Sequence, residues 1–468
     1  MCGMNVKSAV AVIICACACG LRATETTSRP EELVKLLPQE TVEEKSARLH
    51  WWTHSRFGMF IHFGLYALPA RHEWVKMKER IPEEQYQRYF ERFDPDLADP
   101  RDWARRAKDA GMKYIVLTTK HHEGFCLWDT KFTDYKIPNT AFKRDLVREY
   151  VDAVRAEGLK VGFYYSLIDW HHPDFTVDAA HPRRDGDDPE HKGIPALNVG
   201  KDMARYRQYM IDQVTELLTQ YGKIDIIWFD FSYPGEFGKG RDDWNSAAIL
   251  ALARRLQPGV IVDNRLDLND VPGGYDFVTP EQVRVEKWPE VDGCRVPWET
   301  CQTFSGSWGY HRDEMSWKTP AQCLDLLIGT VAHGGNLIMN VGPTGRGEID
   351  DRAASRLEAF AKWMRRNSRS IYGCTQAPAE FIVPSGSHLT YNPQTRRLYI
   401  HLMEYPAGSV GIRFGEKIDY AQFLHDASEL KVDAVVNKKN DPNEYEHYIR
   451  VPVVKPGVEV PVIECFLK

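Results

Sequence analysis

The sequence lacks most features that mark metal-binding, disulfide-rich, membrane-spanning or nucleic-acid-binding proteins. Its ten cysteines include no C-x-x-C pair, which argues against structural zinc and against a disulfide framework. The net charge of −6 argues against nucleic acid or an anionic membrane as a partner. Beyond residue 20, no stretch is long and apolar enough to span a membrane. The 468 residues, 43% hydrophobic and 27% charged, are typical of a globular protein with one large domain and one smaller domain.

Common catalytic motifs are also missing. Neither H-x-H nor H-E-x-x-H occurs, and the adjacent residues His121 and His122 would point to opposite faces of a strand. No G-x-S-x-G turn presents a nucleophilic serine. We therefore expect a site without metal or other cofactor. A metal-dependent barrel hydrolase is kept as an alternative, and it predicts bound zinc.

The N-terminus does carry one apolar run. Lys7 precedes residues 9–20, a stretch of the length of a signal peptide and too short to span a bilayer comfortably. We expect residues 1–24 to be a signal peptide, cleaved near Ala23. A lipoprotein leader using Cys17 or Cys19 is the alternative. Either reading predicts an exported protein, periplasmic or extracellular, free or lipid-anchored.

Strand-like and helix-like segments alternate through residues 25–374. Amphipathic stretches between apolar runs predict helices, the longest at about 202–221. Eight such units predict an α/β fold, a (β/α)8-like TIM barrel. A doubly wound open sheet would need a Gly-rich phosphate-binding turn after the first strand, and Phe63-Gly64-Leu65-Tyr66 does not fit. The predicted strands cover residues 58–64, 114–120, 160–166, 223–231, 260–265, 276–282, 297–303 and 336–341.

Residues 375–468 show a different pattern. Short alternating runs are separated by turns rich in Pro, Gly, Asn and Asp, which predicts an antiparallel β-sandwich. No acid pair in this region suggests catalysis. We expect it to pack against the barrel or to serve as an accessory sugar-binding module.

The stretch 223–231 carries the first candidate for a catalytic residue. Side chains alternate along a strand, so Ile226, Trp228 and Asp230 should share one face. The C-terminal ends of parallel barrel strands carry the chemistry, and Asp230 lies at that end. A carboxylate there must be solvated, paired or catalytic, because burying it alone is costly.

Polar and aromatic residues recur at the predicted C-terminal ends of six successive strands. One histidine at a strand end is usually a core residue, but six such ends indicate a pocket for a polyhydroxylated ligand. The high aromatic content of 12% fits rings that stack on sugar faces. The residues at these ends are His62, Glu73, Trp74, His121, His122, Tyr164, Trp228, Asp230, Arg265 and Glu281.

Two of these residues form a carboxylate pair. Glycoside hydrolysis needs one carboxylate that attacks or stabilises the oxocarbenium ion and one acid that protonates the departing oxygen. Asp230, near His and Arg donors, should stay ionised as the nucleophile. Glu281, if it is less solvated, should have a raised pKa and deliver the proton. A non-catalytic sugar-binding protein is a second alternative.

Several segments resemble the α-L-fucosidases of glycoside hydrolase family 29. The resemblance covers roughly residues 45–375 and implies a retaining hydrolase of terminal α-L-fucosides that needs no metal, with a (β/α)8-like barrel and a C-terminal β-sandwich. It also implies a fucosylated glycan or glycoconjugate as the substrate. The segments are Phe60-Ile61-His62-Phe63-Gly64, Glu73-Trp74, Thr119-Lys120-His121-His122-Glu123-Gly124-Phe125, Tyr164-Tyr165-Ser166, Trp228-Phe229-Asp230 and Asn336-Leu337-Ile338-Met339-Asn340-Val341-Gly342-Pro343.

The resemblance also implies roles for single residues. Asp230 resembles the nucleophile. For the acid/base, Asp-Phe-x-Thr-x-Glu ending at Glu281 matches best, followed by Glu299 and then Glu290; the alternative role of Glu299 is a partner of a His or Arg. The residues that resemble ligands of the fucose ring are His62, Glu73, Trp74, His121, His122, Tyr164, Trp228 and Arg265.

Two long loops should overhang the active face. Residues 173–198 follow the third predicted strand, and residues 231–243 follow the fourth. Loops of this length in a compact domain are usually functional or disordered. We expect them to shape the site for the group beyond fucose.

Overall fold

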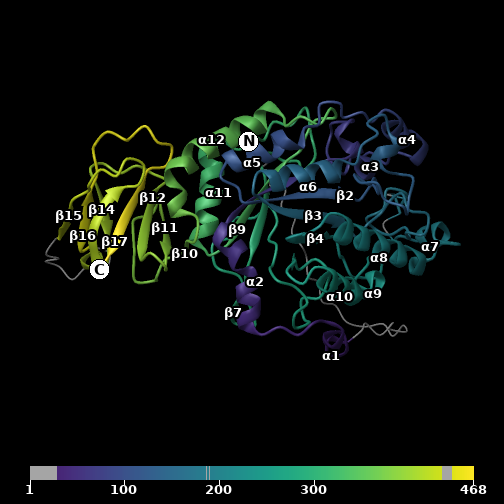
Figure 1. Cartoon of the computed structure of the whole chain (residues 1–468), viewed down its shortest axis with the longest axis horizontal. Helices are drawn as coiled ribbons and strands as arrows, with labels where there is room; N and C mark the ends of the chain where they lie inside the picture. Colours follow the sequence, from purple (N-terminus) through teal and green to yellow (C-terminus); the bar gives the residue numbers. More distant parts are fainter. Residues whose placement is uncertain (1–28, 186, 189, 435–444) are drawn as a thin grey trace, which may run out of the picture.

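A computed structural model describes residues 29–185, 187–188, 190–434 and 445–468. The predicted signal peptide, residues 1–24, lies outside the described residues. Within them, an α/β region precedes a region of antiparallel strands (Figure 1). This order confirms the predicted α/β fold with a C-terminal β region.

A curled sheet of seven parallel strands occupies the centre of the α/β region. Its order is β5-β4-β3-β2-β1-β9-β8. Isolated parallel bridges join Phe277 to Asp263, Val278 to Trp298, and Glu281 to Cys301. The segment 277–281 therefore lies between the two edge strands, where the sixth strand is predicted. The strands are β1 (Phe57–Ile61), β2 (Tyr114–Lys120), β3 (Lys160–Ser166), β4 (Ile226–Asp230), β5 (Ile261–Val262), β8 (Glu299–Thr303) and β9 (Asn336–Val341).

The helices begin where a polar side chain caps the first turn. Asp202 accepts a hydrogen bond from the backbone of Ala204 at the start of the longest helix, and Thr41 and Thr319 form capping boxes. Among these helices, the longest therefore starts at Met203, within one residue of its predicted position. They are α1 (Pro30–Leu33), α2 (Val42–Ser55), α3 (Val75–Lys78), α4 (Glu83–Glu91), α5 (Pro100–Asp109), α6 (Leu146–Ala156), α7 (Ile194–Leu197), α8 (Met203–Gln220), α9 (Arg241–Trp244), α10 (Ser246–Leu256), α11 (Pro320–Ala332) and α12 (Asp351–Asn367).

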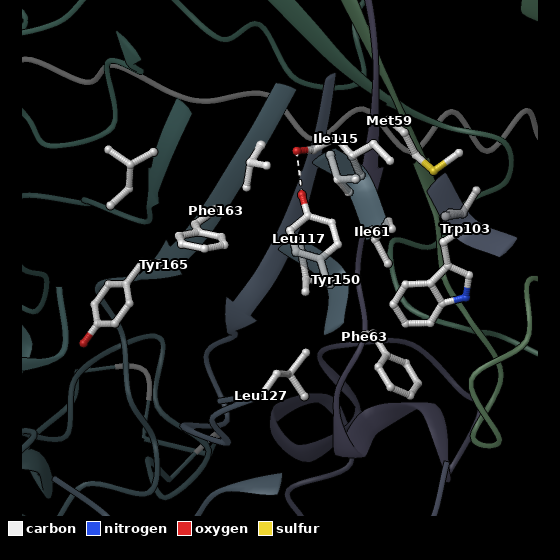
Figure 2. Close-up of a cluster of buried hydrophobic side chains, with 14 of the residues drawn as sticks. Met59, Ile61, Phe63, Trp103, Ile115, Leu117, Leu127, Tyr150, Phe163 and Tyr165 are labelled. Atoms are coloured by element: carbon white, nitrogen blue, oxygen red, sulfur yellow. Dashed lines mark hydrogen bonds between the residues drawn. The ribbon is translucent and has the colours of Figure 1, made fainter. Parts of the chain in front are cut away.

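Alternation along the strands separates two apolar clusters. On the face toward the helices, Ile115 and Leu117 of β2 and Phe163 of β3 pack with Trp103 of α5 (Figure 2). Tyr150 of α6 belongs to the same cluster and donates a hydrogen bond of 2.7 Å to the carbonyl of Ile115. The other face carries a smaller cluster that includes Phe60, Val116, Tyr164, Ile226 and Trp228. Ile226 and Trp228 therefore share a face, as predicted, and Asp230 ends that face.

The C-terminal strands form two antiparallel sheets beside α11 and α12 (Figure 1). Residues of both sheets, among them Ile400, Ile412 and Ile463, belong to one buried cluster. Trp363 of α12 donates a hydrogen bond of 2.9 Å to the carbonyl of Val460, which joins this region to the helices. The strands are β10 (Thr375–Gln376), β11 (Ser387–Asn392), β12 (Arg397–Leu402), β14 (Ile418–Phe423) and β17 (Val462–Leu467) in one sheet, and β13 (Ser409–Ile412), β15 (Val432–Ala434) and β16 (His447–Arg450) in the other. A short hairpin, β6 (Glu290–Val291) and β7 (Cys294–Arg295), precedes β8.

The described residues contain six cysteines, all with free thiols, five of them buried and Cys294 exposed. The buried thiols pack as small apolar side chains within the apolar clusters. In the same residues, no helix combines the length and the apolar composition needed to cross a bilayer.

Candidate active site

A pocket opens at the C-terminal ends of the parallel strands. Nine of the ten predicted site residues line it, and only Glu73 does not. Strand alternation produces this arrangement: Phe60, Tyr164 and Trp228 form part of its walls. His62, just after β1, follows Phe60 by two residues, and Asp230, at the end of β4, follows Trp228 by two residues. The lining residues are Phe60, His62, Trp74, His121, His122, Tyr164, Trp228, Asp230, Phe231, Arg265, Glu281, Cys301 and Trp308.

Asp230 lies in this pocket among donors. Its Oδ2 accepts a hydrogen bond of 2.7 Å from the hydroxyl of Tyr164, and its Oδ1 lies 2.8 Å from Nη1 of Arg265. Burial, followed by the charge of Asp230, raises the pKa of Tyr164 well above its usual value, so this hydroxyl keeps the proton that it donates. Two donors, one of them charged, stabilise the carboxylate. Arg265 is of the predicted kind, whereas the second donor is the hydroxyl of Tyr164 and not the predicted histidine.

Arg265 joins the two predicted catalytic acids. While Nη1 contacts Asp230, Nη2 lies 2.7 Å from Oε2 of Glu281. Both Nη atoms belong to one planar guanidinium, so the two carboxylates face the same small group. The side chain of Glu281 is 41% exposed and ion-paired. The less solvated surroundings predicted for Glu281 are therefore absent in the free protein, because it lies on the rim, with Arg265 beside it.

Three histidines line the pocket. Burial lowers the pKa of both His62 and His122 to about 3, and that of His121 well below its usual value, so all three rings are neutral at physiological pH. The prediction that His121 and His122 point to opposite faces is wrong. The strand β2 ends at Lys120, and beyond it both rings line the same pocket, with centroids 4.0 Å apart.

Strand alternation therefore does not exclude a metal site here, and the distances between possible ligand atoms are the relevant test. Across the described residues, one group of three His, Cys, Asp or Glu side chains brings its ligand atoms within 4.8 Å of one another. It is Glu416, Glu446 and His447 in the C-terminal region, outside the pocket.

Glu73 lies behind the pocket wall. Its buried Oε2 accepts hydrogen bonds from the backbone nitrogens of Trp308 and Gly309, at 3.1 and 3.0 Å, and from the hydroxyl of Ser307 at 3.3 Å. Burial raises the pKa of Glu73. Glu73 therefore anchors the loop that carries Trp308, instead of contacting the pocket itself. Its neighbour Trp74 does line the pocket.

Glu299, the second candidate for the acid/base, is fully buried beneath Trp228. It accepts hydrogen bonds from Nε1 of Trp228 at 3.4 Å, from Nε1 of Trp52 at 3.3 Å, and from the hydroxyl of Tyr114. Burial raises the pKa of Glu299 to about 7. Its partners are Trp and Tyr side chains, not the His or Arg expected from the sequence, and it is not among the lining residues. Glu290, the third candidate, is exposed on β6.

The sequence patterns do not single out four of the lining residues, Phe60, Phe231, Cys301 and Trp308. Trp308 lies in an irregular segment between β8 and α11, where no periodicity indicates its direction. Its ring lies 5.0 Å from that of His62. Phe231 directly follows Asp230 with a positive φ of 83°, an unusual backbone conformation for a bulky residue. The one local feature that could indicate Trp308 is the segment Gly306-Ser307-Trp308-Gly309, in which an aromatic residue lies between glycines in a loop.

Comparisons with known proteins agree with this site. A family model described as Alpha-L-fucosidase matches residues 28–369. Tissue alpha-L-fucosidase of Mus musculus is 31% identical over 350 residues, covering 69% of this chain and 71% of that protein. Plasma alpha-L-fucosidase of Homo sapiens is 29% identical over 387 residues, covering 76% of each.

Solved structures show the same similarity. Alpha-L-fucosidase isoenzyme 1 from Paenibacillus thiaminolyticus has 43% identity and a TM-score of 0.81, covering 91% of this chain and 99% of that one. A GH29 alpha-L-fucosidase from Bacteroides thetaiotaomicron, trapped as a covalent intermediate in complex with 2-fluoro-fucosyl fluoride, has 26% identity and a TM-score of 0.78, covering 93% and 99%. With a family model matched over most of its length, this chain belongs to the α-L-fucosidase family, GH29.

Proposed function

We propose that this protein is a retaining exo-glycosidase that removes terminal α-L-fucose from a glycan or glycoconjugate. Asp230 is the nucleophile and Glu281 the acid/base. The observation that carries this assignment is the bridge of Arg265 between the two carboxylates within a pocket of histidines and tryptophans. Family membership supports the reaction, and the covalent intermediate trapped in a relative supports retention.

The reaction takes two displacements. In the first, a carboxylate oxygen of Asp230 bonds to the anomeric carbon while the bond to the leaving oxygen breaks, and Glu281 gives that oxygen its proton. In the second, Glu281 takes a proton from water, the water oxygen bonds to the anomeric carbon, and Asp230 leaves as a carboxylate.

The remaining site residues position the sugar. We propose that the pocket walls contact the fucose ring through polar atoms and aromatic faces. Glu73 contributes through the loop that holds Trp308. The proposed ligands are His62, Trp74, His121, His122, Tyr164, Trp228 and Arg265.

We further propose that the parallel sheet closes into a (β/α)8-like barrel. The bridges of segment 277–281 to Asp263 on one side and to Trp298 and Cys301 on the other support this closure. On this proposal, residues 25–374 form the catalytic barrel and residues 375–468 a β-sandwich, whose two sheets share one buried cluster.

Export is proposed on two grounds. Residues 9–20 have the composition of a leader, and the plasma alpha-L-fucosidase of Homo sapiens is among the relatives. The similarity to tissue and plasma fucosidases leads us to propose a fucosylated glycan outside the cell as the substrate.

A panel of aryl glycosides of fucose, galactose and glucose, assayed with and without chelator, tests this function. The proposal predicts release of the aryl group from the α-L-fucoside alone, at the same rate in both conditions. Loss of activity with chelator would favour a metal-dependent hydrolase. Binding of fucose without release of any aryl group would favour a sugar-binding protein.

The two long loops are tied together near the pocket mouth. Asp178 of the first loop is buried and accepts hydrogen bonds from the hydroxyl of Tyr233 and from Nζ of Lys239, both in the second loop. The ring of Tyr233 lies 5.0 Å from that of Phe231, which lines the pocket. We propose that this loop pair shapes the subsite for the group beyond fucose.

Removing the contacts of Asp178 with the second loop is expected to change which fucosyl linkages the enzyme prefers. Replacing Asp178 with alanine removes the ionic partner of buried Lys239, a loss of about 3–5 kcal/mol that should loosen both loops. We expect about a tenfold change in relative kcat/KM among fucosyl disaccharides of different linkage, with little change for an aryl fucoside. Asp187→Ala, on the exposed part of the first loop, is the control. Equal losses on disaccharides and aryl fucoside would refute the proposal.

A further inference from the structure

The amide of Asn340 has only one orientation that satisfies its neighbours. Asn340 lies on β9 and is buried, with Nδ2 placed 2.6 Å from the carbonyl oxygen of Trp308. A carbonyl oxygen can only accept, so the amide nitrogen must face it. The amide Oδ1 therefore faces Nδ1 of His62, at 2.6 Å. Because Oδ1 also can only accept, the hydrogen of this bond belongs to Nδ1 of His62.

Ser166 acts on His122 in the same way. Its hydroxyl has one hydrogen, which it donates to the carbonyl of Ile168 at 2.8 Å. The contact of 2.7 Å between Ser166 Oγ and Nδ1 of His122 must then be donated by the ring. Two unrelated elements, β9 and β3, thus place a hydrogen on the same ring nitrogen of two pocket histidines.

A neutral imidazole has a single ring hydrogen, so Nε2 of both rings carries a lone pair. Burial lowers the pKa of each ring to about 3, which keeps them neutral. Nε2 of His122 lies 4.0 Å from Oδ2 of Asp230, and both atoms are acceptors. They cannot bond to each other, but a donor hydroxyl placed near them could reach either.

We infer that Asn340 and Ser166 are positioning residues that hold His62 and His122 as Nδ1–H tautomers, so that both rings accept hydrogen bonds from hydroxyl groups of the sugar. The inference rests on the proposed function and deepens it. The pocket selects a polyhydroxylated ligand in part because these rings offer no hydrogen at Nε2. A ligand that presents an acceptor in place of either hydroxyl would face a lone pair.

Asn340 also connects the tautomer of His62 to the shape of the pocket. Its amide nitrogen holds the carbonyl of Trp308, while Glu73 holds the backbone nitrogen of the same residue. The ring of Trp308 packs against His62 at a centroid distance of 5.0 Å. The buried amide of Asn340 therefore fixes both the position of Trp308 and the ring nitrogen of His62 that carries the hydrogen.

Replacing Asn340 with aspartate tests the inference. The carboxylate has nearly the same shape, but its charge beside Nδ1 raises the pKa of His62 and favours the imidazolium ion. Protonation puts a hydrogen on Nε2, which then cannot accept. Glu73 lies behind Trp308, and the other titratable groups that line the pocket with His62 are His121 and His122 after β2, Tyr164 on β3, Asp230 on β4, Arg265 and Glu281 after β5, and Cys301 on β8.

The readout is KM for an aryl α-L-fucoside as a function of pH, divided by the wild-type KM at each pH. We expect this ratio to rise about tenfold between about pH 8 and about pH 5, as His62 gains its proton. The lost bond to Trp308 adds a factor that does not depend on pH. A ratio that stays constant over this range would overturn the role of Asn340.

Asn336→Asp is the matched control. It lies at the other end of β9, outside the pocket, with Oδ1 3.4 Å from Nη1 of Arg56, which can pair with a new carboxylate. Its KM ratio should not change with pH. Ring-nitrogen NMR of wild-type protein labelled at histidine should show a protonated Nδ1 and an unprotonated Nε2 for His62 and His122. The opposite tautomer would refute the inference without any reference to activity, whereas a wild-type protein that releases no fucose would instead refute the proposed function.

Discussion

Replacing Asp230 with asparagine is expected to lower kcat for an aryl α-L-fucoside by about 10⁴-fold or more, with the protein still folded. Asparagine has the same shape, so Tyr164 and Arg265 keep partners of similar geometry. An uncharged amide cannot form the covalent bond to the anomeric carbon, nor stabilise the positive charge that develops there. The loss should therefore appear in kcat, with thermal unfolding close to that of the wild type.

Asp225→Asn is the control for this change. Asp225 immediately precedes β4 and is also buried, and its Oδ2 accepts a hydrogen bond of 3.1 Å from the backbone of Val161. An amide oxygen keeps that bond, and the residue lies at the strand end opposite the pocket. Its activity should be near normal. Near-normal activity in Asp230→Asn would remove Asp230 from the mechanism.

Replacing Glu281 with alanine is expected to lower kcat by about 10²–10⁴-fold for substrates with a poor leaving group. A substrate with a good leaving group needs no proton in the first displacement, so its covalent intermediate should still form. Without the base, this intermediate should then accumulate. Added azide fits the space left by the carboxyl and needs no base, so it should restore turnover and give a fucosyl azide with the anomeric configuration of the substrate.

Glu299→Ala separates the two candidates for the acid/base. Glu299 accepts hydrogen bonds from Trp52, Trp228 and Tyr114, all buried, and its loss leaves these donors unpaired. We expect lower stability, an activity loss that is similar for good and poor leaving groups, and no response to azide. Azide rescue of Glu299→Ala, with none of Glu281→Ala, would transfer the acid/base role to Glu299.

The sequence predicts the parts of this molecule that local rules control. Alternation places Ile226, Trp228 and Asp230 on one face because β4 is a regular strand, and a side-chain cap at Asp202 marks the start of α8. Nine of the ten predicted site residues line the pocket, since the ends of parallel strands converge there.

The failures occur where the chain leaves regular structure. His121 and His122 follow the end of β2, so strand alternation does not apply to them. Trp308 donates its backbone N–H to Glu73 and accepts at its carbonyl from Asn340. Both partners are distant in sequence, and no local pattern predicts such contacts.

The protonation and solvation of the site residues also depend on groups that are distant in sequence. The solvation of Glu281 depends on its place at the rim and on its pairing with Arg265, sixteen residues away. Burial keeps His62 neutral, and the amide of Asn340 on β9 lies beside its Nδ1. The sequence is enough to identify such residues, but their protonation depends on burial and on neighbours that come together only in the folded pocket.

The most direct test of the central claim is to trap the intermediate with 2-fluoro-fucosyl fluoride and map the labelled peptide by mass spectrometry. The fluorine beside the anomeric carbon slows both displacements, and the good fluoride leaving group lets the first proceed while the second stalls. We predict one fucosyl adduct, on Asp230. A label on another carboxylate, or release of fucose with inverted configuration and no adduct, would contradict the assignment of Asp230 as the nucleophile of a retaining enzyme.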